Sequence, residues 1–245
     1  MYIQVLLLLV AIVMLYFGAE FALEAAERIG KHFGLSPLVI GLLIIGFGTS
    51  LPEFFVSQFA AFRNEAPIAM GNIVGSNIAN LFLILGVSAL ITPLCLKGKE
   101  IIKQQWFHVV LTSLLVICLL QPKLYLWCGA LLASFFVVYM VTLFKGMKSE
   151  EQDDDELEQT LSYKTFLHLV SGFVLLFYGG EVLVSSGSRL AILAGIDSFV
   201  ISAIFVAFGT SFPELVTAIL ACKKKKDTDI IVGNILGSNI FNVAF

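Results

Sequence analysis

Charged residues are scarce in this 245-residue chain, and that scarcity excludes a soluble globular protein. Asp, Glu, Lys and Arg make up 13% of the sequence, hydrophobic residues make up 58%, and the mean hydropathy is +0.95. A soluble globule needs more polar side chains to cover its surface. The 15 basic residues are scattered along the chain, which argues against a nucleic-acid-binding surface. The composition predicts an all-α polytopic membrane protein.

Cysteine is equally scarce. The four cysteines, Cys95, Cys118, Cys128 and Cys222, lie in or beside apolar stretches without the spacing of a metal site. We expect them to act as small packing residues. The apolar run at residues 2–19 has no basic segment before it and no polar cleavage region after it. It is therefore predicted to be a retained first span and not a signal peptide.

A transmembrane helix needs about 20 apolar residues. On that rule the chain has about eight spans, near residues 2–26, 36–62, 68–94, 104–120, 124–144, 164–187, 197–221 and 228–245. Cytoplasmic loops are enriched in Lys and Arg. An outer N-terminus places 12 of the 15 basic residues in inner connections, leaving only Arg63, Lys123 and Arg189 outside. We therefore expect an N-out orientation.

One motif occurs twice inside apolar runs. G-T-S-L-P-E at residues 48–53 returns as G-T-S-F-P-E at residues 209–214, so Glu214 is the second copy of Glu53. An ionisable residue at bilayer depth indicates a functional site. The proline before each glutamate removes a helical hydrogen bond and frees a backbone carbonyl. Broken helices in paired repeats are typical of a transporter's binding site.

The repetition extends on both sides of this motif. Residues 15–20 match residues 176–181 at the same offset, and G-N-I-V-G-S-N-I-A-N at 71–80 matches G-N-I-L-G-S-N-I-F-N at 233–242 after one inserted residue. Five spans lie between the start of the first unit and the start of the second. Because five is an odd number, the second unit enters the membrane from the opposite side and is inverted. We expect an inverted repeat of five helices each, the second incomplete. Residues 1–145 form the first unit, 146–163 an acidic cytoplasmic linker, and 164–245 the second unit.

The repeated polar residues share helix faces. Helical spacing places Thr49, Ser50 and Glu53 on one face of their span. It also places Ser76, Asn77 and Asn80 on one face of the next span. The equivalent residues of the second unit have the same spacing and share faces in the same way. Inversion brings both sets to the membrane midplane. The predicted cage of carboxylate, hydroxyl, amide and carbonyl oxygens suits Ca²⁺, Na⁺ or Mg²⁺. Two carboxylates match one divalent ion or several monovalent ions, and unpaired charges make the empty cage costly, which favours exchange over leak.

The paired motifs closely resemble the repeats of the cation/Ca²⁺ exchanger superfamily, above all prokaryotic sodium/calcium exchangers. The resemblance implies a Ca²⁺/Na⁺ antiporter that works by alternating access, in which the first span of each repeat slides across the core. It implies no resident cofactor, with Ca²⁺ and Na⁺ as transported ions. The implied metal-binding positions are Glu53, Glu214, Thr49, Ser50, Thr210, Ser211, Ser76, Asn80, Ser238, Asn242, Gly46 and Ala207. An inner (plasma) membrane location follows from the same resemblance.

Two departures from the family pattern leave alternatives open. Asn80 and Asn242 stand where some relatives carry Asp, which disfavours potassium dependence. Proton-coupled relatives usually show G-N-x-x-E in place of G-T-S-x-P-E, so a Ca²⁺/H⁺ antiporter is the second interpretation. Family members have ten spans, whereas this chain ends at Phe245 in the eighth. The third interpretation is that the chain is a C-terminally truncated fragment that does not transport ions.

An enzyme is not expected. An intramembrane serine hydrolase built around Ser50 or Ser211 would need a base within hydrogen-bond reach. No histidine or lysine falls in the middle of the predicted spans that carry these serines. The sequence shows no obligate protein partner, and its lipid contacts are those of any polytopic protein.

Overall fold

The computed structural model describes residues 2–94, 99–121, 123, 125–146, 161–196 and 209–245, which are helices and their connections without any strand. Residues 147–160 of the predicted acidic linker and the predicted ligand Ala207 lie outside these residues. The helices of the first half are α1 (Tyr2–His32), α2 (Pro37–Val39), the π-helix η1 (Ile40–Ile45), α3 (Gly46–Thr49), α4 (Leu51–Phe62), α5 (Ala66–Ile78), the π-helix η2 (Ala79–Ile84), α6 (Leu85–Ile91), α7 (Lys99–Leu119) and α8 (Leu126–Gly146). Those of the second half are α9 (Tyr163–Leu193), α12 (Phe212–Lys223) and α13 (Thr228–Ala244).

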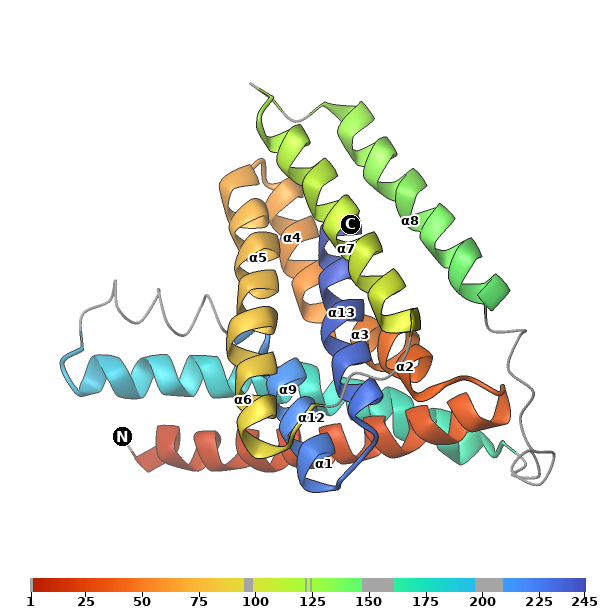
Figure 1. Cartoon of the computed structure of the whole chain (residues 1–245). Coiled ribbons are helices and arrows are strands. Elements are labelled where there is room, and N and C mark those ends of the chain that lie inside the picture. Colours follow the sequence, from red (N-terminus) through yellow and green to blue (C-terminus); the bar gives the residue numbers. More distant parts are fainter. Residues whose placement is uncertain (1, 95–98, 122, 124, 147–160, 197–208) are drawn as a thin grey trace.

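Helices α1 and α9 form a pair that lies across the other helices (Figure 1). They run antiparallel and touch through small residues. A Cβ on Gly172 would lie 2.7 Å from the backbone nitrogen of Ala22, and one on Gly18 would lie 2.9 Å from that of Leu176. Small residues permit such close approach between membrane helices. The backbones of the two helices are therefore in close contact.

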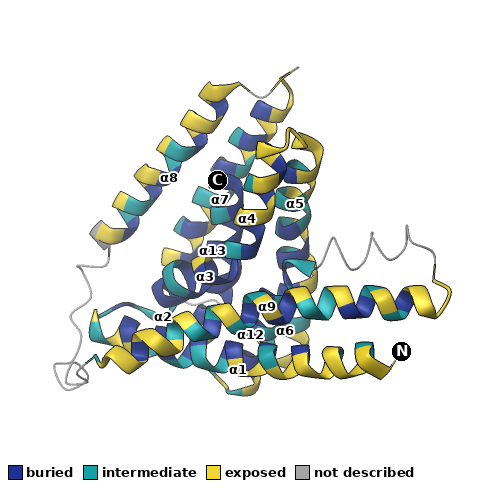
Figure 2. Cartoon of the chain, turned by 180° about the vertical axis from the view of Figure 1, so that it is seen from behind, coloured by how far each residue is buried: buried dark blue, intermediate teal, exposed yellow. Residues whose placement is uncertain are grey.

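Helix α13 is the centre of the remaining bundle (Figure 2). It is buried along nearly its whole length and packs against η1, α3, α7 and α8. Two glycines make the approach to η1 possible. A Cβ on Gly233 would lie 2.4 Å from the carbonyl oxygen of Leu38, and one on Gly237 would lie 2.4 Å from that of Leu42. Both glycines of the second G-N-x-x-G motif thus have a packing role.

Within the described residues, five helices are long and apolar enough to cross a membrane, namely α1, α5 continued through α6, α7, α8 and α9. A sixth span arises if Pro37–Thr49 and Leu51–Phe62, which meet at 45°, form one bent helix. These match the first six predicted spans. The predicted seventh begins at residue 197, outside the described residues, and the predicted eighth corresponds to the 17-residue α13.

The backbone repeats itself at the offset found in the sequence. Helices α1 and α9 are both 31 residues long and begin at the equivalent residues Tyr2 and Tyr163. Helices α4 and α12 are both 12 residues long and are related by the same offset. The positive φ angles recur too, at Gly34 (66°) and Gly195 (79°), and at Asn64 (60°) and Lys225 (51°). Each unit therefore ends these two helices with the same turn.

Three cysteines fall within the described residues. Cys118, Cys128 and Cys222 are all buried and free. This agrees with the predicted packing role.

Candidate functional site

Each glutamate of the repeated motif lies just after a break in its helix. Ser50 (φ −83°, ψ 2°) separates α3 from α4, and Glu53 lies in the first turn of α4 behind Pro52. Ser211 (φ −88°, ψ 6°) precedes α12 in the same way, and Glu214 lies in its first turn. The proline cannot continue the previous helix but fits the start of a new one. Both carboxylates therefore lie at helix N-termini, where the backbone favours negative charge.

The two carboxylates are fully buried and are held by residues of the opposite unit. Glu53 is 1% exposed and Glu214 is 0% exposed. The hydroxyl of Ser211 donates to Glu53 Oε1 at 3.2 Å, and the hydroxyl of Ser50 donates to Glu214 Oε1 at 3.3 Å. The serine of each motif thus supports the glutamate of the other motif. This reciprocal arrangement places both carboxyl groups in one site.

The threonines and the Asn-bearing helices extend the same reciprocity. Thr49 Oγ1 lies 3.3 Å from Asn234 Oδ1 and 3.5 Å from Ser238 Oγ. In the other half, Thr210 Oγ1 lies 3.3 Å from Asn72 Oδ1 and 3.4 Å from the hydroxyl of Ser76. Each threonine therefore contacts the Asn and the Ser of one G-N-x-x-G-S-N motif: Thr49 the second copy, Thr210 the first.

Amide groups and a backbone carbonyl complete the surroundings. Asn80 Nδ2 donates to Asn239 Oδ1 at 2.9 Å, and both side chains are fully buried. Ser238 donates to the carbonyl oxygen of Gly46 at 3.2 Å. Asn242 is 6% exposed and lines a small pocket beside Glu53. The π-helix η1 ends at Ile45, just before Gly46, and the π-helix η2 begins at Ala79, just before Asn80. π-helical turns are often found at functional sites.

Several buried oxygens of the site have no hydrogen-bond partner among the described residues. They are Glu53 Oε2, Glu214 Oε2, Asn77 Oδ1 and Asn80 Oδ1. Buried polar atoms are normally satisfied, so each exception asks for an explanation. Carboxylate and amide oxygens are hard ligands that suit Na⁺ and Ca²⁺. Among the described residues, no three or more His, Cys, Asp or Glu side chains are placed so that they could hold a metal ion together.

The structure brings the predicted residues together, apart from Ala207, which is not described. The sequence reasoning left three residues out of the predicted ligands: Asn72, Asn234 and Asn239. Asn72 and Asn234 contact the threonines, and Asn239 binds Asn80. All three belong to the repeated G-N-x-x-G-S-N motif. Their recurrence at equivalent positions was the available signal.

Comparisons with known proteins identify the family to which this chain belongs. The sodium/calcium exchanger protein family matches residues 3–145 and 164–245. Inner membrane protein YrbG of Escherichia coli is 32% identical over 247 residues, covering 97% of this chain and 76% of YrbG. Sodium/calcium exchanger MaX1 of Methanosarcina acetivorans is 28% identical over 282 residues, covering 97% of this chain and 79% of MaX1.

Solved structures of a sodium-calcium exchanger are also similar to this chain. The sodium-calcium exchanger NCX_Mj, soaked with Na⁺ and without Ca²⁺, superposes with a TM-score of 0.85 at 29% identity, over 98% of this chain and 79% of that one. A structure of NCX_Mj soaked with Na⁺ and Sr²⁺ superposes with a TM-score of 0.84. The repeated motifs, the reciprocal carboxylates and these matches lead to one conclusion: the chain belongs to the sodium/calcium exchanger protein family.

Proposed function

We propose that this protein is a secondary antiporter that exchanges Ca²⁺ for Na⁺ by alternating access. The observation that carries the proposal is the pair of buried carboxylates, each held by a serine of the opposite unit. Two carboxylates match the charge of one Ca²⁺ or of several Na⁺ ions. The neutral hydroxyl and amide oxygens around them provide further ligands for either ion. The names of MaX1 and NCX_Mj as sodium/calcium exchangers support the choice of ions.

In this proposal the two units are an inverted repeat about an axis in the membrane plane. The equal helix lengths, the recurring turns and the antiparallel course of α1 and α9 support it. Such a repeat places the ion site at the midplane between its two halves. Exchange then requires the site to open to one side at a time.

The proposed location is the inner (plasma) membrane with the N-terminus outside. The Lys and Arg bias between connections supports this orientation. The name of YrbG as an inner membrane protein supports the location.

Ca²⁺ uptake into vesicles tests the coupling ion. Vesicles containing this protein are loaded with Na⁺ and diluted into Na⁺-free buffer with labelled Ca²⁺. We expect uptake that requires the Na⁺ gradient and disappears when the vesicles are loaded with K⁺. Uptake driven by a proton gradient alone would contradict Na⁺ coupling and favour a Ca²⁺/H⁺ antiporter.

The reciprocal serines give a second prediction. Ser50→Ala and Ser211→Ala each remove the hydroxyl that donates to a carboxylate of the other unit. We expect each variant to raise the Ca²⁺ concentration for half-maximal uptake by about 10–100-fold, the usual effect of losing a group that orients a metal ligand. The matched control is Ser113→Ala on α7, because Ser113 is exposed and, among the described residues, donates to the carbonyl oxygen of Val109 alone. A strong effect of one serine and none of the other would contradict a shared site.

A further inference from the structure

The side-chain amide of Asn72 on α5 is hydrogen-bonded at both ends. Its nitrogen donates to the backbone carbonyl oxygen of Glu53 at 3.0 Å and to the hydroxyl oxygen of Ser57 at 2.9 Å. Its oxygen accepts a hydrogen bond from the hydroxyl of Thr210 at 3.3 Å. Chemistry fixes the orientation of this amide, because a carbonyl oxygen only accepts and must therefore face the nitrogen. One side chain thus joins the helix of one glutamate to the motif of the other.

These contacts hold two of the predicted ion ligands. Asn72 bonds to the first and second turns of α4, so it fixes the part of the helix that carries Glu53. The hydroxyl of Thr210 has a single proton, and donating it to Asn72 leaves the lone pairs of the oxygen free to face the site. Such hard oxygens are the ligands that Na⁺ and Ca²⁺ prefer. Asn72 therefore acts on the ion site through Glu53 and Thr210.

The equivalent asparagine of the second unit is bonded at one end only. Asn234 Oδ1 lies 3.3 Å from Thr49 Oγ1, which repeats the contact between Asn72 and Thr210. The nitrogen of Asn234 has no hydrogen-bond partner among the described residues, although Asn234 is only 1% exposed. Buried polar atoms are normally paired, so the missing bond needs a cause.

The sequence supplies that cause. The repeat relates Ser57 of α4 to Ala218 of α12, and alanine has no hydroxyl group to accept a bond. The carbonyl oxygen of Glu214 remains, but Asn234 does not bond to it. Helix α13, which carries Asn234, packs here against η1, α3 and α12, and all three are described in full. The difference between the two units thus begins with one side chain.

We propose that Asn72 and Ser57 form a clamp that positions Glu53 and Thr210 for ion binding, and that the second unit lacks this clamp. The inference rests on the function proposed above, because it assigns a role within the same ion site. The clamp keeps the Glu53 side of the site in its binding geometry before an ion arrives, so little ordering is needed on binding. The Glu214 side has fewer fixed contacts, and its asparagine contributes less to affinity.

Calorimetric titration of the detergent-solubilised protein with Ca²⁺ in Na⁺-free buffer tests the clamp. Asn72→Ala removes all three contacts, and we expect it to raise the dissociation constant about 10–100-fold, the usual effect of losing a group that orients a metal ligand. Ser57→Ala gives the first unit the alanine of the second and removes one contact, so we expect a rise of about 2–10-fold. Asn234→Ala also removes one contact, with Thr49, and should cost about 2–10-fold.

The fitted stoichiometry separates positioning from folding. A partly misfolded variant binds fewer ions per chain at parental affinity, whereas lost positioning raises the dissociation constant at unchanged stoichiometry. Because Asn72 and Ser57 act together, the double variant should bind Ca²⁺ no more weakly than Asn72→Ala alone. Ser113→Ala again serves as the serine control, and we expect it to bind Ca²⁺ like the parent.

A larger rise for Asn72→Ala than for Asn234→Ala supports the clamp. Equal rises, or a parental dissociation constant in Asn72→Ala, overturn it. If Asn72→Ala yields no folded protein, Ser57→Ala decides the question, and parental affinity in that variant overturns the clamp.

The outcome is separable from that of the proposed function, because binding is measured without any ion gradient. If the affinities change as expected but Na⁺-driven Ca²⁺ uptake is absent, the proposed exchange fails and the clamp stands. If uptake is present but Asn72→Ala binds Ca²⁺ like the parent, the clamp fails and the exchange stands. A parent protein that binds no Ca²⁺ overturns both.

Discussion

Replacement of either buried glutamate by glutamine is expected to reduce Na⁺-driven Ca²⁺ uptake at least ~100-fold. Glutamine keeps the shape of the side chain but removes the negative charge. Loss of a group that only orients a metal ligand costs about 10–100-fold, and a charged ligand should cost at least as much. In the buried site no water replaces the missing charge, since Glu53 and Glu214 are at most 1% exposed. Uptake into Na⁺-loaded vesicles measures the effect for Glu53→Gln and Glu214→Gln.

The same experiment has a matched control in the chain. Glu65 is an exposed glutamate at the start of α5 whose side chain caps no backbone group. Glu65→Gln makes the same chemical change outside the site, and we expect parental uptake. Because both glutamates act in one site, the double variant should be little worse than either single variant. Parental uptake by Glu214→Gln would refute the shared carboxylate site.

Gly237→Ala is expected to lower the free energy of unfolding by about 2–3 kcal/mol, near the upper end of the overpacking range. The added methyl group would lie 2.4 Å from the carbonyl oxygen of Leu42 and 2.8 Å from its Cα. These are backbone atoms, so no side-chain rotation relieves the clash and α13 must separate from η1. Thermal unfolding in detergent, followed by intrinsic fluorescence, measures the loss.

Gly129→Ala is the control for this prediction. Gly129 lies in α8, and a Cβ there meets nothing within 4 Å. Alanine is the better helix former, so the unfolding temperature should stay the same or rise slightly. An equal fall in both variants would show that the effect comes from helix glycines in general. The contact between α13 and η1 would then not be the cause.

The central site was predictable because its signal is local and repeated. A buried glutamate after a proline is unusual in an apolar run, and the recurrence of Glu53 as Glu214 within the same motif excludes coincidence. Helix periodicity then places Thr49, Ser50 and Glu53 on one face. The three missed asparagines lie in the same repeated segments, but their roles depend on which partner they meet.

The partners themselves depend on how two distant segments pack. Ser211 supports Glu53, Ser50 supports Glu214, and each threonine contacts one Asn-bearing motif, α13 for Thr49 and α5 for Thr210. Spacing along the chain cannot distinguish these contacts from contacts within one unit. The contacts of Thr49 with α13 follow from the close approach of α13 to η1, which Gly233 and Gly237 permit.

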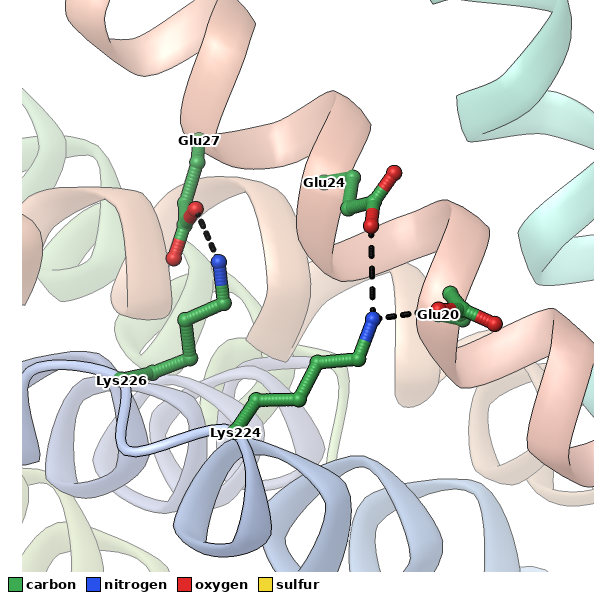
Figure 3. A network of polar contacts seen from close by, with 5 residues as sticks. All are labelled: Glu20, Glu24, Glu27, Lys224 and Lys226. Atoms are coloured by element: carbon green, nitrogen blue, oxygen red, sulfur yellow. Dashed lines mark hydrogen bonds and ion pairs between the residues drawn. The ribbon is translucent and has the colours of Figure 1, made fainter.

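The sequence by itself determined the membrane class, the repeat, and the residues that carry charge inside it, because hydropathy and motif recurrence are properties of the chain alone. Only the tertiary structure decided which side chains of the two units meet. Glu20 and Glu181 are equivalent in sequence, yet Glu20 pairs with Lys224 (Figure 3), whereas Glu181 forms no ion pair with any described residue. Equivalent positions of a repeat can have different partners, because distant segments meet through packing and not through their spacing along the chain.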